Sequence, residues 1–250
     1  GVALIPTFAS STDAEGVVVN LYESGTAKLK LRDGTSVTLE TKTKYPADGR
    51  IQIAVTPAKP KSFSVKLRLP PWCPDAAIQV NGKKAAAKAG RDGYAAIERE
   101  WKSGDQIELS FKLEPRVVLG DHRNEGRLAL MFGALVLAAD ESLLGVQEPA
   151  LNAIGVPSAD LKAIHFTPEP APEKFKTWPF AEVFRVDAVA RKRCGSLKQG
   201  APMKILLVPF ADAGASGSNY KIWLPFKDPA PNRNLLADGV EIRSRKPNAG

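Results

Sequence analysis

The chain has 250 residues, of which 44% are hydrophobic and 25% are charged, a composition typical of a folded globular protein and not of a disordered chain. The formal net charge is +8, but most basic residues stand singly, and the one tight cluster, Arg191-Lys192-Arg193, has no neighbouring aromatic residues for base stacking. No apolar run approaches the roughly 20 residues of a membrane helix, so neither a nucleic acid nor a membrane is predicted as a partner.

The first half of the chain alternates strand-like runs with turn signals, which favours a β-sandwich over βαβ units. In residues 63–69 every second residue is apolar, the pattern of a strand with one buried face. The Asn81-Gly82 step predicts a tight hairpin turn. Strands are expected at residues 16–22, 27–32, 35–45, 50–55, 63–69, 78–80, 93–98 and 106–113. Together they predict a first antiparallel sandwich over residues 1–120.

The second half has a different pattern. The apolar run Leu128 to Ala139 predicts a strand buried on both faces, with Gly133 as a bulge or a point of close approach. Residues 148–180 are rich in proline and are expected to form a long surface loop with little strand pairing. Regular structure is expected again at residues 204–210 and 219–224.

The predicted fold class is therefore all-β, with two tandem antiparallel β-sandwich domains of the jelly-roll or immunoglobulin-like kind. The expected divisions are residues 1–120 for the first sandwich, 121–226 for the second with its proline-rich loop, and 227–250 for a tail or linker.

Candidates for chemistry are few. The two histidines, His122 and His165, lack further ligands at metal-binding spacing and are interpreted as surface loop residues. Glycosidases use two carboxylates that flank the scissile bond, but the acidic residues here follow the polar faces of strands, and no pair is singled out. Cys73 and Cys194 are expected in different domains without a disulfide. No catalytic residue and no metal ligand is predicted.

The four tryptophans are the candidates for sugar contact, since an indole face can stack on a sugar ring. Trp72 and Trp101 are expected to cap the sandwich core, and Trp223 is expected to be buried or at an interface. Trp178 lies beside the proline-rich segment, where a loop position favours exposure. It is the one residue predicted to bind carbohydrate.

A series of motifs points to a family. A strand that ends in Pro70-Pro71-Trp72 is followed by Asn81-Gly82, by Gly93-Tyr94 and by the Arg-x-Trp-x-x-Gly-Asp motif of residues 99–105. Their order resembles the β-sandwich region that follows the catalytic barrel in glycoside hydrolase family 127 (GH127), the β-L-arabinofuranosidase group. Further segments are similar to the same region, at residues 17–22, 43–46, 126–136, 207–210 and 220–225.

The resemblance implies that catalysis belongs to an upstream (α/α)6 barrel with a zinc-bound cysteine nucleophile. No position of this chain matches that barrel, so no cofactor is expected in this fragment. Residues 1–6 have no features of a secretion signal. If the parent enzyme is exported, to the periplasm or outside the cell, its signal is expected upstream.

Three functions remain open at this point. The first is a non-catalytic portion of a GH127-like enzyme, with the enzyme's own barrel as partner. The second is an autonomous carbohydrate-binding module for a plant-type or microbial polysaccharide. The third and weakest is an immunoglobulin-like protein interaction module. A sandwich separated from its barrel is also expected to expose apolar surface and to form homo-oligomers.

Overall fold

The computed structural model describes residues 7–144, 151–173, 182–190, 197, 200–227, 233–235 and 241–243. The described part is all-β, as predicted, and its helical elements η2 to η5 are 3-10 turns of three residues each. None of the described helices has the length and the hydropathy needed to cross a membrane. The chain divides into two compact units, Gly1–Leu113 (unit 1) and Glu114–Gly250 (unit 2).

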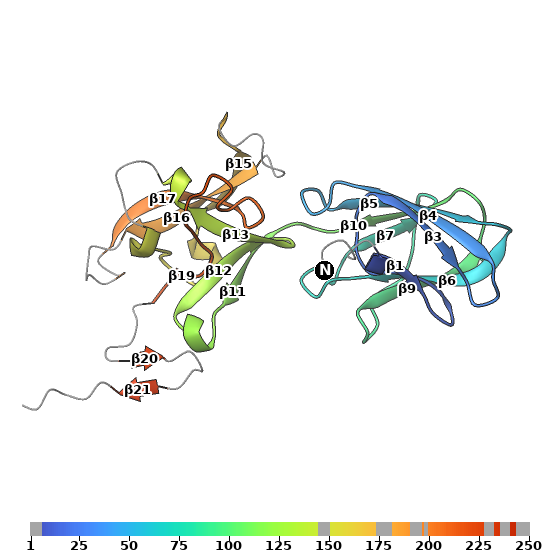
Figure 1. Cartoon of the computed structure of the whole chain (residues 1–250), viewed down its shortest axis with the longest axis horizontal. Coiled ribbons are helices and arrows are strands. Elements are labelled where there is room, and N and C mark those ends of the chain that lie inside the picture. The colour runs from blue at the N-terminus through green and yellow to red at the C-terminus, as the bar shows by residue number, and fades with distance from the viewer. Residues whose placement is uncertain are drawn as a thin grey trace, which may run out of the picture. The chain divides into compact units, whose positions relative to one another are not determined.

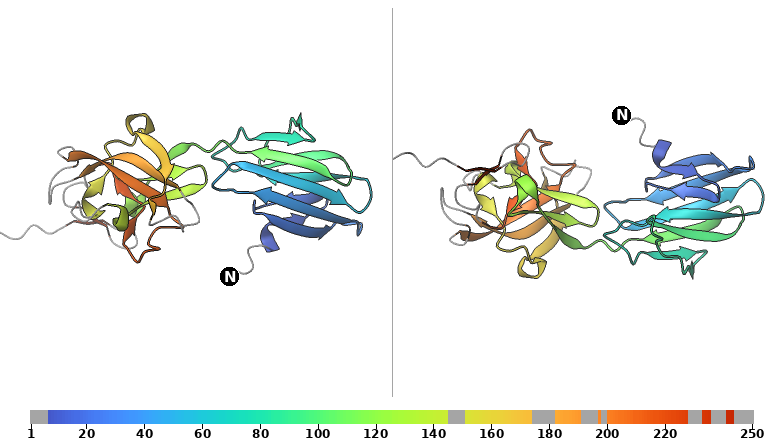
Figure 2. Two further views of the ribbon diagram at one scale, coloured as in Figure 1. Left: turned by 90° about the horizontal axis from the view of Figure 1, so that it is seen from above. Right: turned by 90° about the horizontal axis from the view of Figure 1, so that it is seen from below.

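Unit 1 contains two sheets, which appear as two layers in Figures 1 and 2. The strand order is β1-β2-β6-β9 in one sheet and β3-β4-β5-β10-β7-β8 in the other. The strands are β1 (Ser10–Thr12), β2 (Gly16–Val19), β3 (Gly25–Lys30), β4 (Ser36–Thr43), β5 (Arg50–Pro57), β6 (Lys61–Arg68), β7 (Ala77–Val80), β8 (Lys83–Lys84), β9 (Tyr94–Trp101) and β10 (Asp105–Ser110).

The core of unit 1 lies between these sheets. Val65 and Leu67 of β6 are fully buried, as are Ile51 and Ile53 of β5 in the opposite sheet, and all four belong to one apolar cluster. The alternation predicted for residues 63–69 thus places the apolar side chains inside. Each such side chain stabilises the fold by roughly 1.5–3 kcal/mol, so the two sheets are held together mainly by apolar burial.

One strand pair differs from the antiparallel expectation. β2 runs parallel to β6, with Gly16 opposite Ser64 in the register. A Cβ atom at Gly16 would overlap the carbonyl oxygen of Ser64. Only glycine lets the two backbones approach this closely at the start of the parallel pair.

The Arg-x-Trp-x-x-Gly-Asp motif forms the turn that carries the chain from β9 in one sheet to β10 in the other. The indole N–H of Trp101, which is fully buried, donates to the carbonyl oxygen of Phe63 at 3.0 Å. Asp105 accepts from the backbone N–H of Lys102 at 2.9 Å and from the side-chain amide of Asn81 at 2.8 Å. The motif therefore has a structural role, which is to close one end of the sandwich.

The Pro-Pro-Trp turn after β6 has a similar explanation. Trp72 packs on Phe111, and Phe111 also contacts Tyr22 and Tyr45, with ring centroids 5.5–5.7 Å apart. The hydroxyl of Tyr22 donates to the carbonyl oxygen of Arg68 at 2.7 Å. This aromatic cluster covers an edge of the unit 1 core.

In the described residues of unit 2, nine strands join into a single sheet, apart from the small β20–β21 pair described below. The order is β11-β12-β13-β17-β16-β14, and β15, β18 and β19 pair at its side. The strands are β11 (Pro115–Leu119), β12 (Arg127–Phe132), β13 (Leu135–Asp140), β14 (Ile154–Gly155), β15 (Phe166–Pro170), β16 (Glu182–Ala190), β17 (Ala201–Pro209), β18 (Tyr220–Lys221) and β19 (Leu224–Pro225). The 3-10 turns are η2 (His122–Asn124), η3 (Glu141–Leu143), η4 (Leu151–Ala153) and η5 (Leu161–Ala163).

Unit 2 starts at Glu114, earlier in the chain than the expected division between residues 120 and 121. The reason is that β11 pairs with β12 through five residue pairs and so belongs to the sheet of unit 2. The apolar run 128–139 is a hairpin and not one strand, because the chain reverses between β12 and β13 at Gly133, whose φ is +53°.

The proline-rich segment also contains more pairing than predicted. Strand β15 pairs with β16 through five residue pairs, and Pro168 and Pro170 are tolerated because β15 has a partner on one side only. Beyond residue 227, where a tail or linker is expected, β20 (Arg233–Leu235) and β21 (Glu241–Arg243) form an antiparallel pair.

Candidate functional site

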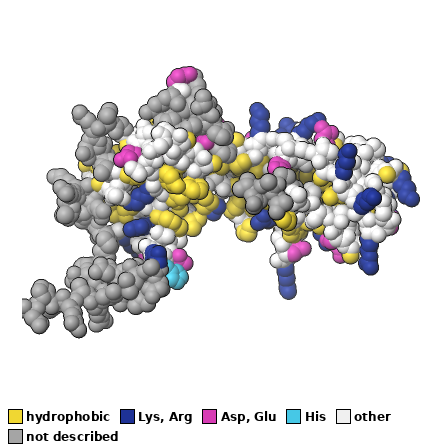
Figure 3. Space-filling view, in the orientation of Figure 1, with side chains coloured by type: hydrophobic (Ala, Val, Ile, Leu, Met, Phe, Trp, Pro, Cys, Tyr) yellow, Lys and Arg dark blue, Asp and Glu magenta, His cyan; other side chains and the backbone are white. Residues whose placement is uncertain are grey.

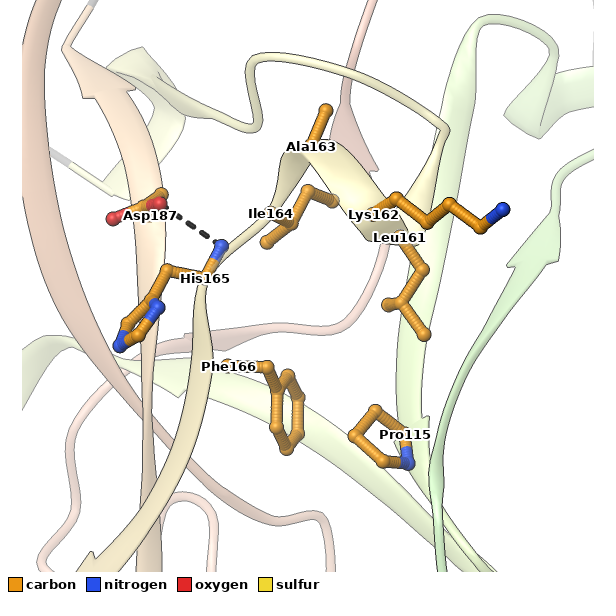
Figure 4. Close-up of a pocket in the computed structure, with 8 residues that line it drawn as sticks. All are labelled: Pro115, Leu161, Lys162, Ala163, Ile164, His165, Phe166 and Asp187. Atoms are coloured by element: carbon orange, nitrogen blue, oxygen red, sulfur yellow. Dashed lines mark hydrogen bonds between the residues drawn. The ribbon is translucent and has the colours of Figure 1, made fainter.

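A hollow of about 450 Å³ opens on unit 2 at the start of β15. Its volume lies within the range of small-molecule sites, about 300–1,000 Å³. The residues that give it its chemical character are Pro115, Leu161, Lys162, His165, Phe166 and Asp187 (Figure 4).

The turn η5 shapes one side of this hollow. Asp160 precedes the turn, and its carboxylate accepts from the backbone N–H of Lys162 at 3.0 Å, as an N-terminal capping residue does. Ile164 follows and is buried in the unit 2 core. The chain therefore enters β15 from a fixed direction, with His165 as the last residue before the strand.

His165 and Asp187 are joined by two hydrogen bonds. The backbone N–H of His165 donates to Asp187 Oδ2 at 2.9 Å, and the backbone N–H of Asp187 donates to the carbonyl oxygen of His165 at 3.2 Å. The imidazole Nε2 of His165 lies 3.0 Å from Thr167 Oγ1, which orients the ring. Within the described ranges, Nδ1 of His165 and Oδ1 of Asp187 make no hydrogen bond and remain available to a ligand.

The two sides of the hollow differ in character. Figure 4 shows His165 and Asp187 on one side and the apolar side chains of Leu161, Phe166 and Pro115 on the other. Among the described residues that line the hollow, Asp187 is the one acidic residue. Hydrolysis of a glycosidic bond normally requires a pair of carboxylates, and the described lining of the hollow contributes one.

The described tryptophans do not form an open sugar platform. Trp101 is fully buried, and Trp72 and Trp223 are half-buried. Trp178, the residue predicted to bind carbohydrate, lies outside the described residues, so its role stays a prediction.

The histidines are placed differently from each other. Both are exposed, as expected for surface loop residues; His122 lies in η2, and His165, just before β15, also contributes to the hollow. Sequence reasoning did not single out His165, because its partner Asp187 comes 22 residues later on another strand. No local spacing connects the two.

Zinc ligands are not brought together in the described part of the chain. Cys73 is a free, buried cysteine in the unit 1 core, and Cys194 lies outside the described residues. Among the described residues, no three His, Cys, Asp or Glu side chains are close enough to hold a metal ion. The described residues therefore do not form a zinc site.

Asp140 is the most deeply buried acidic residue described, and its partners show that it is structural. It accepts four hydrogen bonds, from the backbone N–H and the hydroxyl of Ser142, the backbone N–H of Gly214 and the hydroxyl of Ser218. Burial raises the pKa of this carboxyl, but the hydrogen bonds outweigh burial, and the net pKa lies below the ordinary value. Asp140 thus anchors the loop of residues 214–218 to β13.

Basic side chains are spread over the face of unit 1 seen in Figure 3 and do not gather in a stripe. Several are paired with acids, as Lys66 is with Asp13 and Glu15, both at 2.7 Å. This distribution suits a solvated surface. The absence of a nucleic-acid partner stays a prediction.

Comparison with known proteins places these features in a family context. Residues 16–113 match the family model of the GH127 β-L-arabinofuranosidase middle domain. A GH127 β-L-arabinofuranosidase from Geobacillus stearothermophilus T6 has a similar fold, with a TM-score of 0.74 and 23% identity over 90% of this chain. A second glycoside hydrolase gives a TM-score of 0.71 and 24% identity over 87% of the chain. A further GH127 β-arabinofuranosidase gives a TM-score of 0.69 and 27% identity over 84% of the chain.

The chain spans 36%, 37% and 35% of the lengths of these three proteins, respectively. No curated protein matches it. The resemblance to the GH127 region beyond the barrel is thus confirmed, by the family model for residues 16–113 and by fold for most of the chain.

Proposed function

Since residues 16–113 match the GH127 middle domain, we propose that the chain is the non-catalytic β-sandwich portion of a glycoside hydrolase related to β-L-arabinofuranosidases. Its role is to support a catalytic barrel encoded by the same gene. In this proposal the barrel holds the zinc and carries out the hydrolysis, and this chain holds neither the metal nor the nucleophile.

The proposal rests on a difference in coverage: the fold match includes most of this chain but only a minor part of the matched enzyme. The match to the Geobacillus enzyme covers 90% of this chain but only 36% of that enzyme. The hollow supplies one carboxylate, and the described residues do not assemble a zinc site. Both features suit a supporting portion of a larger enzyme.

Exposed apolar side chains provide surface that a barrel would cover. Leu119, Phe210 and Tyr220 of unit 2 are 60%, 46% and 45% exposed, and Phe8 of unit 1 is 62% exposed. Apolar side chains are visible over the region of β11 to β13 in Figure 3. Surface of this kind commonly marks a contact with another domain or chain.

The test begins with the gene sequence upstream of Gly1, which we expect to encode a barrel with clustered Cys and Glu residues. The barrel alone, the barrel mixed with this chain, and the continuous protein would then be assayed on an aryl β-L-arabinofuranoside. We expect no turnover by this chain, and a higher unfolding temperature for the barrel when the chain is present. A barrel that is equally stable and active without the chain would contradict the supporting role.

An autonomous carbohydrate-binding module is the second candidate, and the hollow beside His165 is the observation that favours it. The partner in this case is a polysaccharide of plant or microbial origin. A start codon and a secretion signal directly before Val2 in the gene would favour this alternative over the supporting role.

A further inference from the structure

We propose that the hollow beside His165 is a binding site for one neutral sugar residue. This inference does not depend on the supporting role, because a sugar site is compatible with a portion of a larger enzyme and with an independent module. It concerns unit 2, which the GH127 middle-domain model does not cover.

The charges that line the hollow favour a neutral ligand. Asp187 is a carboxylate that would repel an anion, and one acid among the described lining residues is insufficient to hold a metal cation. The ammonium of Lys162 lies on the opposite side of the hollow from Asp187 (Figure 4). Sugar hydroxyls both donate and accept hydrogen bonds, so they can pair with Oδ1 of Asp187 and with Nδ1 of His165.

The apolar wall provides the second part of the recognition. Phe166 is stacked on Phe132 with ring centroids 6.1 Å apart and contacts Phe184 at 5.4 Å, so its position is fixed from behind. Pro115 from β11 lies beside it. The C–H face of a sugar ring can pack on such a surface while its hydroxyls reach the polar side.

The polar side is also held in place before any ligand binds. The two hydrogen bonds between His165 and Asp187 fix their backbones, and the contact with Thr167 orients the imidazole. A preformed site loses less conformational entropy on binding than a mobile one does. The hollow is open to solvent, which is consistent with weak and reversible binding.

Calorimetry and saturation-transfer NMR on the whole chain would test the site, with methyl β-L-arabinofuranoside and arabinotriose as neutral probes and citrate as an anionic probe. The variants are His165→Ala, which removes an exposed side chain, and Asp187→Asn, which keeps an acceptor for the backbone of His165. His122→Ala is the matched control, because it removes the other exposed histidine of the same unit. Circular dichroism melting would check that each variant is folded.

We expect millimolar binding of the neutral probes, weakened about tenfold in His165→Ala and in Asp187→Asn and unchanged in His122→Ala. No binding of either sugar up to about 10 mM, or binding that all three variants leave unchanged, would overturn the proposal. Binding of citrate in place of the sugars would overturn it too. Because this experiment measures sugar binding and not turnover or barrel stability, a negative result would not contradict the supporting role.

Discussion

Replacement of Trp101 tests whether this residue has a structural role or a sugar-binding role. The residue lies in the Arg-x-Trp-x-x-Gly-Asp motif of residues 99–105, and an indole in such a motif could either close the core or stack on a ligand. Trp101 is fully buried, and its indole N–H donates to the carbonyl oxygen of Phe63 at 3.0 Å. The structure therefore predicts a large loss of stability for unit 1.

The expected magnitude follows from burial and from the hydrogen bond. Trp101→Ala removes a fully buried indole and should lower the free energy of unfolding by about 3–5 kcal/mol. Trp101→Phe keeps an aromatic ring but removes the donor to Phe63, and the lost hydrogen bond together with the smaller ring should cost about 2–3 kcal/mol. Trp72→Phe is the control, because Trp72 is half-buried and should cost less than about 1.5 kcal/mol.

Urea unfolding followed by far-ultraviolet circular dichroism would measure these differences. The ranking should be Trp101→Ala, then Trp101→Phe, then Trp72→Phe. If Trp101→Phe lowered the free energy of unfolding by less than about 0.5 kcal/mol, the indole would not be needed for the stability of unit 1. A role in ligand binding would then have to be reconsidered.

Four further outcomes are expected. Gly16→Ala should lower the melting temperature of unit 1, because the added Cβ overlaps the carbonyl oxygen of Ser64. Unit 2 should lose stability as the pH falls through about 3.8 and below, since the folded-state pKa of Asp140 lies under that ordinary value, and a melting series with Asp140→Asn should show a weaker dependence. Added zinc should produce no arabinofuranoside hydrolysis by this chain, and zinc-dependent turnover lost in Cys73→Ser would refute this. Sedimentation should show concentration-dependent association, reduced in Phe210→Asp because this change removes an exposed apolar ring.

The sequence predicts unit 1 well because its signals are local. Alternation in residues 63–69 reports one buried face directly, and Asn81 and Gly82 have the positive φ values, 50° and 74°, that a tight hairpin requires. The parallel pairing of β2 with β6 is not local, and nothing in either segment distinguishes a parallel neighbour from an antiparallel one.

Unit 2 is harder to predict because both faces of its strands are covered. Leu128, Ala129 and Leu130 are all buried, so no alternation shows where β12 ends and β13 begins. The hollow was missed for a related reason, because two of its polar side chains, His165 and Asp187, come together only through the pairing of β15 with β16. The residue types alone do not show that these two side chains lie close together.

The parallel pair also bears on the order in which unit 1 folds. Between β2 and β6 the chain first builds β3, β4 and β5, all of which belong to the other sheet. A parallel pair of strands cannot form by simple hairpin closure. The chain must lose conformational entropy to close the intervening segment before the β2–β6 contacts form. We therefore expect the β3-β4-β5 meander to assemble early and the β1–β2 hairpin to dock late, as the slowest step in completing the sandwich.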